Sequence, residues 1–126
     1  MKIKHWTDVP EQPAEGIEGV TVRWVIAEGD GAPHFAMRVF DVQPGCASPY
    51  HNHWWEHEVY VLDGQGVAVH GGAASSAPCE TPIAAGSVVL VEGNEMHQFR
   101  NTGEGVLRFI CLIPHMWLEG VAAEHS

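Results

Sequence analysis

Three histidines at even spacing constrain this chain more than any other feature of its sequence. His51, His53 and His57 lie within seven residues of one another, and side chains of an extended segment alternate between two faces. The three rings would therefore share one face, which Val59 and Val61 continue. Imidazoles rarely turn inward among valines unless a partner satisfies their nitrogens. We expect an extended segment whose inner face binds a metal ion, because imidazole is the commonest metal-binding side chain.

Short runs of strand-forming residues recur along the chain, and none has the period of a long amphipathic helix. The tight turn Asp63-Gly64-Gln65-Gly66 predicts a hairpin, since glycine supplies the positive φ that such turns need. We expect a mobile connection over 71–76 and a short helical or irregular tail after Pro114. Many short strands separated by turns are typical of a β-sandwich or barrel. The expected strands cover residues 20–26, 35–42, 58–62, 67–70, 87–91, 97–101 and 106–113.

Composition narrows the class of protein. The 126 residues, 45% of them hydrophobic, predict one folded domain over 1–126. A net charge of -10 leaves no basic stripe for nucleic acid and disfavours anionic membranes. No apolar run approaches a membrane span, and the first residues lack the apolar core of a secretory signal. Three widely spread cysteines do not form a disulfide framework, so we expect a cytoplasmic protein.

Two segments resemble the sequence motifs of the cupin superfamily. Gly45 to Gly64 resembles the first motif, in which a glycine, His-x-His, an acidic residue and a second glycine recur at set intervals. Residues 86–101 resemble the second motif, with Gly86, His97 and Asn101 in place. The resemblance covers about residues 34–113 and is strongest to small single-domain cupins with a four-histidine site. It implies an all-β fold, a double-stranded β-helix (jelly-roll) barrel that holds a metal ion inside.

The first motif departs from the family pattern at one ligand position. Where the family has a glutamate, this chain has His57, and Glu58 follows one position later. Strand alternation places His57 on the face of His51 and His53, and it turns Glu58 away unless a bulge intervenes. We therefore expect His51, His53, His57 and His97 as the metal ligands. Glu58 becomes a candidate to accept a hydrogen bond from the N–H of a ligand histidine and so fix the tautomer of that imidazole.

The second motif departs from the pattern in its turn. Glu92 replaces the usual proline and Asn94 replaces the following glycine. Asparagine tolerates the left-handed conformation better than most residues, so we expect the turn to be kept. Asn101 is expected to orient a turn or to make a second-shell contact.

Four neutral imidazoles have a chemical consequence. They leave a divalent ion with its full charge of +2, which favours anionic or enolate-like oxygen donors. If the ion is six-coordinate, two positions stay open for water, dioxygen or a bidentate substrate. We expect one divalent transition metal ion. The resemblance includes manganese sites, whereas imidazole ligands suit Fe, Ni, Cu or Zn; Mn and Fe are preferred, and Zn, Ni and Cu stay open.

Four residues are candidates for the lining of a substrate pocket: Phe99, Phe109, Cys111 and Arg38. Phe99 shares the face of His97, and Phe109 and Cys111 share a face of the last strand. Cys111 is alternatively a small core residue. Arg38 would anchor a substrate carboxylate or form a surface salt bridge. Trp54 and Trp55 would gate a mouth or pack in a core or dimer.

The favoured function is a metal-dependent enzyme with dioxygenase-like chemistry, which oxidises or cleaves a small chelating organic substrate. The alternatives are a non-catalytic small-molecule or metal-binding barrel, a sensor, and a metal-assisted isomerase or hydrolase; an ion that only staples the fold is a further one. The partners expected are a small-molecule ligand and a second copy of the chain, because exposed sheet edges need cover.

Overall fold

A computed structural model describes residues 1–14, 16–71, 77–116 and 118. Apart from Gly71, the connection expected over 71–76 lies outside the described residues, as does most of the tail after Pro114. Two single-turn 3₁₀ helices, η1 (Trp6–Asp8) and η2 (Glu28–Asp30), accompany the strands. The described strands are β1 (Gln12–Pro13), β2 (Val20–Ile26), β3 (Phe35–Val42), β4 (His57–Asp63), β5 (Gln65–His70), β6 (Cys79–Ala84), β7 (Val88–Val91), β8 (His97–Asn101) and β9 (Leu107–Pro114).

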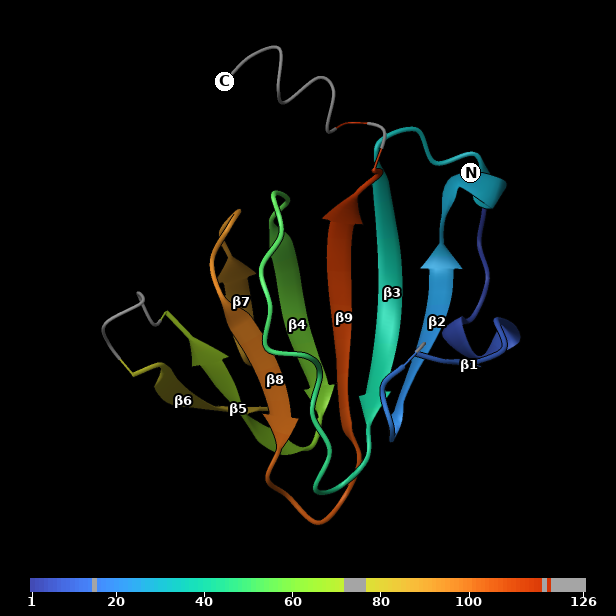
Figure 1. Ribbon diagram of the computed structural model, residues 1–126. Helices are drawn as coiled ribbons and strands as arrows, with labels where there is room; N and C mark the ends of the chain where they lie inside the picture. Colours follow the sequence, from blue (N-terminus) through green and yellow to red (C-terminus); the bar gives the residue numbers. More distant parts are fainter. Residues whose placement is uncertain (15, 72–76, 117, 119–126) are drawn as a thin grey trace.

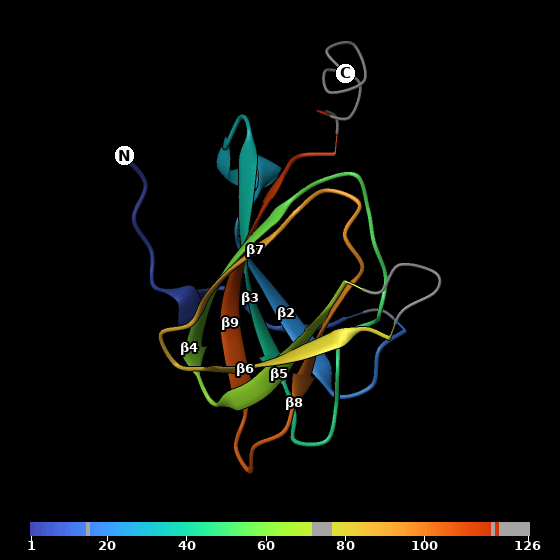
Figure 2. The ribbon, with the colours of Figure 1, turned by 90° about the vertical axis from the view of Figure 1, so that its left-hand side faces the viewer.

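The strands form two antiparallel sheets. The larger has the order β1-β2-β3-β9-β4-β7 and the smaller β6-β5-β8 (Figure 1). One buried cluster joins them, with Ala68, Ile83 and Phe99 of the small sheet among residues of the large one. The side view in Figure 2 shows the small sheet lying across the large one. This architecture is the all-β jelly roll that the sequence predicted.

Alternation along the strands builds the core. In β4, His57, Val59 and Val61 are buried, whereas Glu58 and Tyr60 are exposed. In β9 every second residue from Leu107 to Ile113 is buried in the same way. The inner faces of the two sheets therefore meet in a continuous apolar interior, and His57 enters it as the first residue of β4.

Most strands were predictable from their residue pattern. The predicted ranges 20–26, 35–42 and 97–101 are confirmed without change, and the others shift by one or two residues at their ends. The sequence analysis missed β1 and β6. Strand β6 contains Pro82, and Ile83 is its only buried residue. It pairs only with β5 in the described sheets, and a strand at a sheet edge tolerates proline and needs little apolar pattern.

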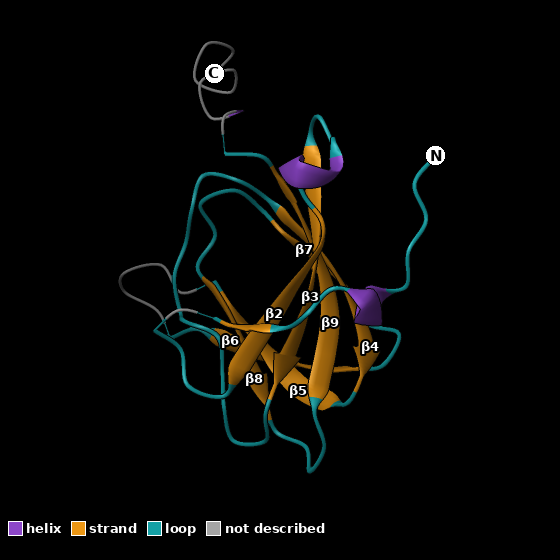
Figure 3. Cartoon of the chain, turned by 90° about the vertical axis from the view of Figure 1, so that its right-hand side faces the viewer, coloured by secondary structure: helices purple, strands orange, loops and turns teal. Residues whose placement is uncertain are grey.

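The N-terminal segment packs on the outer face of the large sheet (Figure 3). The indole of Trp6 contacts two guanidinium groups, with its ring centroid 5.0 Å from Cζ of Arg23 and 4.6 Å from Cζ of Arg108. Arg108 donates two hydrogen bonds to Asp41, from Nε to Oδ1 at 2.7 Å and from Nη2 to Oδ2 at 2.9 Å. Trp6 thus holds the N-terminal segment against the partly buried ion pair between Arg108 and Asp41. No helix in the described part of the chain is long and apolar enough to cross a membrane.

We predict that Trp6→Ala lowers the free energy of unfolding by about 1–2 kcal/mol, because each cation–π contact contributes about 0.5–1 kcal/mol. Denaturant unfolding measures the change. Ile3→Ala, at an exposed residue of the same segment, serves as the control and should leave stability unchanged. An equal loss in both variants would contradict the role of the indole.

Candidate metal centre

Three histidines converge at one end of the barrel. The ligand atoms of His51, His53 and His97 all lie within 4.8 Å of one another. His51 and His97 face each other through two backbone hydrogen bonds, from His97 N to His51 O at 2.9 Å and from His51 N to His97 O at 3.2 Å. The chain before His51 runs beside β8, with a further bridge between Ala47 and Arg100. This pairing brings two distant histidines together.

The segment between His51 and His57 is not the continuous extended strand that the sequence predicted. Only His51 forms an isolated bridge, residues 54–55 bend, and β4 begins at His57. The bend places the indole of Trp55 flat against His53, with ring centroids 3.9 Å apart and planes at 4°. Alternation therefore orients only His57 and the residues after it. Tertiary contacts orient His51 and His53.

The turn before β8 supports two of the histidines. Asn94 has a φ of 67°, which confirms the left-handed conformation predicted for this position. The backbone N–H of Asn94 donates to the backbone carbonyl of His53 at 2.7 Å. Asn52 Nδ2 donates to the backbone carbonyl of Asn94 at 3.1 Å. The Nδ1 atom of His97 lies 2.8 Å from the carbonyl oxygen of Glu95. Since a carbonyl only accepts, Nδ1 carries the proton and Nε2 keeps the lone pair that an ion needs.

His57 lies beside this group, but it is not among the three histidines whose ligand atoms all lie within 4.8 Å of one another. Its ring centroid is 4.5 Å from that of His53 and 5.0 Å from that of His97. The Nε2 atoms of His57 and His53 are 3.0 Å apart. His57 is 7% exposed, and its Nδ1 lies 2.8 Å from Cys111 Sγ. The structure therefore shows a three-histidine cluster with a fourth imidazole in contact with it.

The environment of His51, His53 and His57 favours the neutral form of each ring. Burial lowers the pKa of His57 to about 2, and the nearby Arg38 and the other imidazoles add to the effect. Burial also lowers the pKa of His53 to about 4, with His97 and His51 contributing. The pKa of His51 is lowered by burial and then by His97. Neutral rings hold lone pairs ready for a cation at pH 7.

The donor set fits a transition metal ion. Two nitrogens that bind one ion at about 2.1 Å and at right angles lie about 3.0 Å apart, which is the spacing between Nε2 of His57 and of His53. Nδ1 of His53 is buried without a hydrogen-bond partner among the described residues. Imidazole-only sites suit Fe, Ni, Cu and Zn, and the fit does not identify the metal.

The four residues expected to line a pocket lie in the barrel interior. Phe99 and Phe109 are buried, with ring centroids 5.0 Å apart, and Cys111 is buried beside them. Arg38 Nη2 donates to Cys111 Sγ at 3.1 Å and lies 3.5 Å from Nδ1 of His57. No ion pair in the described part of the chain includes Arg38, whose guanidinium packs over two aromatic rings: Trp24 at 5.3 Å and Phe40 at 4.8 Å.

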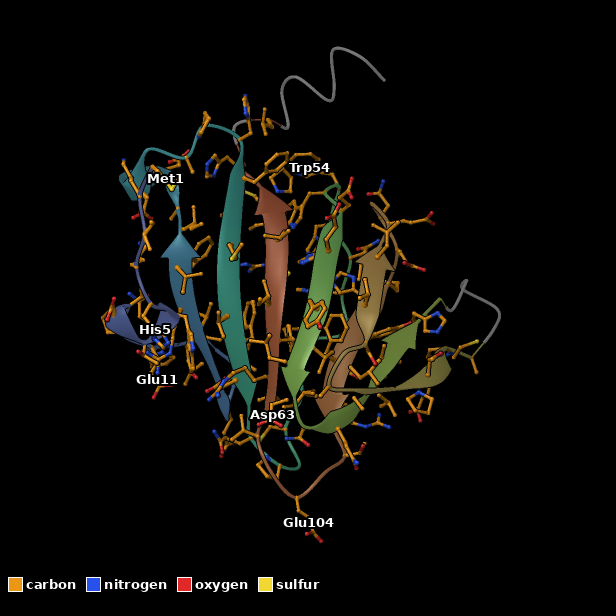
Figure 4. The ribbon with its side chains drawn as sticks, turned by 180° about the vertical axis from the view of Figure 1, so that it is seen from behind. Met1, His5, Glu11, Trp54, Asp63 and Glu104 are labelled. Carbon is orange, nitrogen blue, oxygen red and sulfur yellow. The ribbon has the colours of Figure 1, made fainter. Side chains whose placement is uncertain are left out.

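The two residues expected to contact the metal ligands, Glu58 and Asn101, lie away from the imidazoles. Glu58 is exposed on the outer face of β4. Asn101 is buried at the other end of β8, where Nδ2 donates to the carbonyls of Val42 and Gly105 at 2.8 Å each, and Oδ1 accepts from Gly103 N at 2.8 Å. Asn101 thus orients a turn. Figure 4 shows this end, marked by Glu104, opposite the end marked by Trp54.

Two contributors to the site were missed by the sequence analysis. The carbonyl of Glu95 has no sequence signal, because every residue has one. The stacking of Trp55 on His53 depends on the bend at 54–55. Trp55 follows His53 by two residues, so strand alternation predicts that the two side chains share a face. It does not predict that the rings stack.

Known proteins with similar sequences and structures agree on the fold. The profile of the family described as "Cupin domain" matches residues 38–113. The chain is 33% identical over 91 residues to the 1-methylthio-D-xylulose 5-phosphate methylsulfurylase of Rhodospirillum rubrum. The matched region covers 72% of this chain and 54% of that protein. It is 34% identical over 86 residues to the oxalate-binding protein of Thermotoga maritima, covering 65% and 66%.

Among solved structures, the polyketide cyclase RemF from Streptomyces resistomycificus superimposes with a TM-score of 0.80 at 31% identity, over 90% of this chain and 79% of that one. The chain spans 54% of the methylsulfurylase and 66% of the oxalate-binding protein. The relatives differ in activity, so the likeness extends to the barrel and not to one reaction.

The lowered pKa of His57 predicts that the metal-free protein loses stability in acid. Its pKa falls from 6.5 to about 2 on folding, so below pH 6.5 the unfolded chain binds more protons than the folded one. The stabilisation is complete above pH 6.5 and is lost as the pH falls toward the folded pKa, by up to about 1.4 kcal/mol per pH unit.

Denaturant unfolding of chelator-treated protein at pH 7.5, 6.0 and 5.0 measures this slope. His57→Gln should reduce the slope, with the lowered pKa of His53 causing part of what is left, whereas His70→Gln in the small sheet should keep the wild-type slope. Identical slopes in all three proteins would show that His57 does not cause the acid sensitivity.

Proposed function

This chain belongs to the cupin domain family, and we propose that it is a metal-dependent enzyme acting on a small chelating organic substrate. In this proposal His51, His53, His57 and His97 together hold one divalent transition metal ion. One observation carries it: three imidazoles have ligand atoms within 4.8 Å, and the Nε2 of a fourth lies 3.0 Å from that of His53. Mn and Fe are the preferred ions, and Zn, Ni and Cu are the alternatives.

A divalent ion in this site supplies Lewis-acid chemistry to substrate oxygens and, if it is redox-active, electron transfer with dioxygen. The residues of the chain supply the setting. His57 and His97 are buried, whereas His51 is exposed, so the cluster opens toward solvent on the His51 side. Phe99 and Phe109 form an apolar wall of the interior. This wall excludes water and would strengthen the electrostatic attraction between a bound ion and an anionic substrate.

The substrate class follows from the charge of the donor set. No carboxylate belongs to the histidine cluster in the described residues, so the ligands neutralise none of the ion's charge. An enolisable 1,3-dicarbonyl compound provides two oxygens at chelating distance and one negative charge after loss of a proton. We propose such a compound as substrate, with dioxygen-dependent oxidation or cleavage as the first candidate reaction.

Ring closure without dioxygen is the second candidate reaction. It is favoured by the likeness to the polyketide cyclase RemF, at 31% identity over 90% of this chain. An enolate held by the same site can attack a second carbonyl of the same molecule, so this reaction needs no change in the donor set. Binding without turnover is the remaining alternative, suggested by the name of the oxalate-binding relative.

We further propose that the protein is a homodimer. Four apolar side chains are exposed on the outer face of β4 and β7: Tyr60, Leu62, Val88 and Leu90. Val88 is 74% and Leu90 is 57% exposed, and β7 ends the order of the large sheet. An apolar edge of this kind favours pairing with a second copy. A cytoplasmic location accords with the three free cysteines among the described residues, and cell fractionation tests it.

The metal content of the protein tests the proposed site. We expect protein purified without added metal or chelating resin to carry close to one ion per chain, because four neutral imidazoles converge. The double variant His53→Ala/His97→Ala should lose it, and His70→Gln should retain it. Elemental analysis by mass spectrometry gives both identity and amount. Equal metal in the double variant would exclude this site.

The loaded protein is then mixed with pentane-2,4-dione as a simple 1,3-diketone probe, in air and under nitrogen. Substrate-dependent oxygen uptake supports the oxidative reaction. Conversion of an enolisable polyketone under nitrogen supports ring closure. Metal-dependent binding of the diketone without conversion of either compound would overturn the enzyme proposal in favour of a binding protein.

Light scattering after size-exclusion chromatography tests the dimer. We expect twice the chain mass of 13.7 kDa for the wild type and the chain mass for Leu90→Lys, because a charge on the apolar face opposes its burial. Glu104→Gln serves as the control, because Glu104 lies in a turn at the end of the barrel opposite Trp54 (Figure 4). This variant should stay dimeric. A monomeric wild type at micromolar concentration would refute the interface.

A further inference from the structure

The Nδ1 side of the His57 ring contacts two side chains from other strands. Its Nδ1 lies 2.8 Å from Cys111 Sγ in β9, and the same sulfur accepts a hydrogen bond from Arg38 Nη2 of β3 at 3.1 Å. We propose that Cys111, held by Arg38, is a positioning residue that fixes the tautomer and direction of His57 so that Nε2 faces the ion. This inference rests on the proposed four-histidine site.

A count of protons carries the argument. A neutral imidazole has one N–H, and Nε2 can bind an ion only when that proton is on Nδ1. The proton on Nδ1 then needs an acceptor. The hydrogen-bond partners of Nδ1 among the described residues are Cys111 Sγ at 2.8 Å and Arg38 Nη2 at 3.5 Å, and a guanidinium group has donors only. The sulfur of Cys111 is therefore the acceptor.

The other tautomer would not suit an ion. With its proton on Nε2, His57 would donate to Nε2 of His53 across the 3.0 Å that separates them. Both of these nitrogens would then be occupied by one proton. The sulfur, by accepting from Nδ1, favours the tautomer that frees them both. The ion and the sulfur thus select the same arrangement.

Strand register fixes where the sulfur lies. Cys111 is paired with Arg38 on one side and with Val59 on the other, so its side chain projects into the interior between β3 and β4. It is 2% exposed, which leaves little access for water as a competing acceptor. The guanidinium of Arg38 lies against Trp24 and Phe40, and its Nε is buried without a hydrogen-bond partner in the described residues. Arg38 is thus held on the sulfur.

A merely apolar role for Cys111 makes a different prediction. A small core residue can be replaced by alanine at a cost in stability alone, whereas removal of a group that orients a ligand typically weakens metal affinity by about 10- to 100-fold. Serine at the same position keeps an acceptor, and alanine does not. The pair of substitutions separates packing from orientation.

The experiment compares metal-free wild type, Cys111→Ala and Cys111→Ser by Co²⁺ titration in competition with a chelator. We expect Cys111→Ala to bind Co²⁺ about 10- to 100-fold more weakly and Cys111→Ser to stay within about threefold of the wild type. Cys46→Ala is the matched control, because it removes a thiol near the Asn101 end, where the Cys46 carbonyl accepts from Asn101 N. Thermal unfolding and near-ultraviolet circular dichroism show whether each variant is folded.

Nitrogen-15 spectra of Zn²⁺-loaded wild type give a reading that does not depend on any variant. We expect His57 protonated at Nδ1, and protonation at Nε2 would overturn the proposal even if Cys111→Ala does not fold. A folded Cys111→Ala that binds Co²⁺ as tightly as the wild type would overturn it as well. Unchanged affinity in His57→Ala would refute the positioning role and leave a three-histidine site. A wild type that binds no Co²⁺ would instead refute the proposed site itself.

Discussion

The burial of imidazole nitrogens inside an apolar barrel is the constraint on which this structure depends. A buried polar atom without a partner costs free energy, so each nitrogen needs a hydrogen bond or an ion. Nδ1 of His97 finds the carbonyl of Glu95, and Nδ1 of His57 finds the sulfur of Cys111. The Nε2 atoms of His53 and His57 face each other at 3.0 Å. A shared metal ion would satisfy both of these nitrogens at once.

The two ends of the barrel hold different groups of side chains. At one end the chain before β4 bends, and residues from β8, the preceding turn and the 51–57 segment meet around the imidazoles. At the other end the amide of Asn101 binds three backbone groups and fixes a tight turn (Figure 1). Strand β8 joins the two ends, with His97 at its first residue and Asn101 at its last.

Charge is distributed unevenly between surface and interior. The chain has a net charge of -10, yet the guanidinium of Arg38 lies 3.5 Å from Nδ1 of the buried His57. Arg38 lies behind His57, where its contacts are Cys111 and two aromatic rings. Arg38 therefore places a positive charge behind His57 in a largely apolar interior.

The sequence by itself determined seven of the nine described strands, the inward face of β4 and the left-handed turn at Asn94, because these depend on local alternation and backbone sterics. The spacing of the histidines predicted that they converge, and the resemblance to cupin motifs predicted the jelly roll. Only the tertiary structure decided that 51–57 bends, that Trp55 stacks on His53, and that β6 completes the small sheet. It also decided that Cys111 meets His57 across 54 positions of sequence. Contacts of this kind depend on strand register and on the packing of two sheets, which no local pattern encodes.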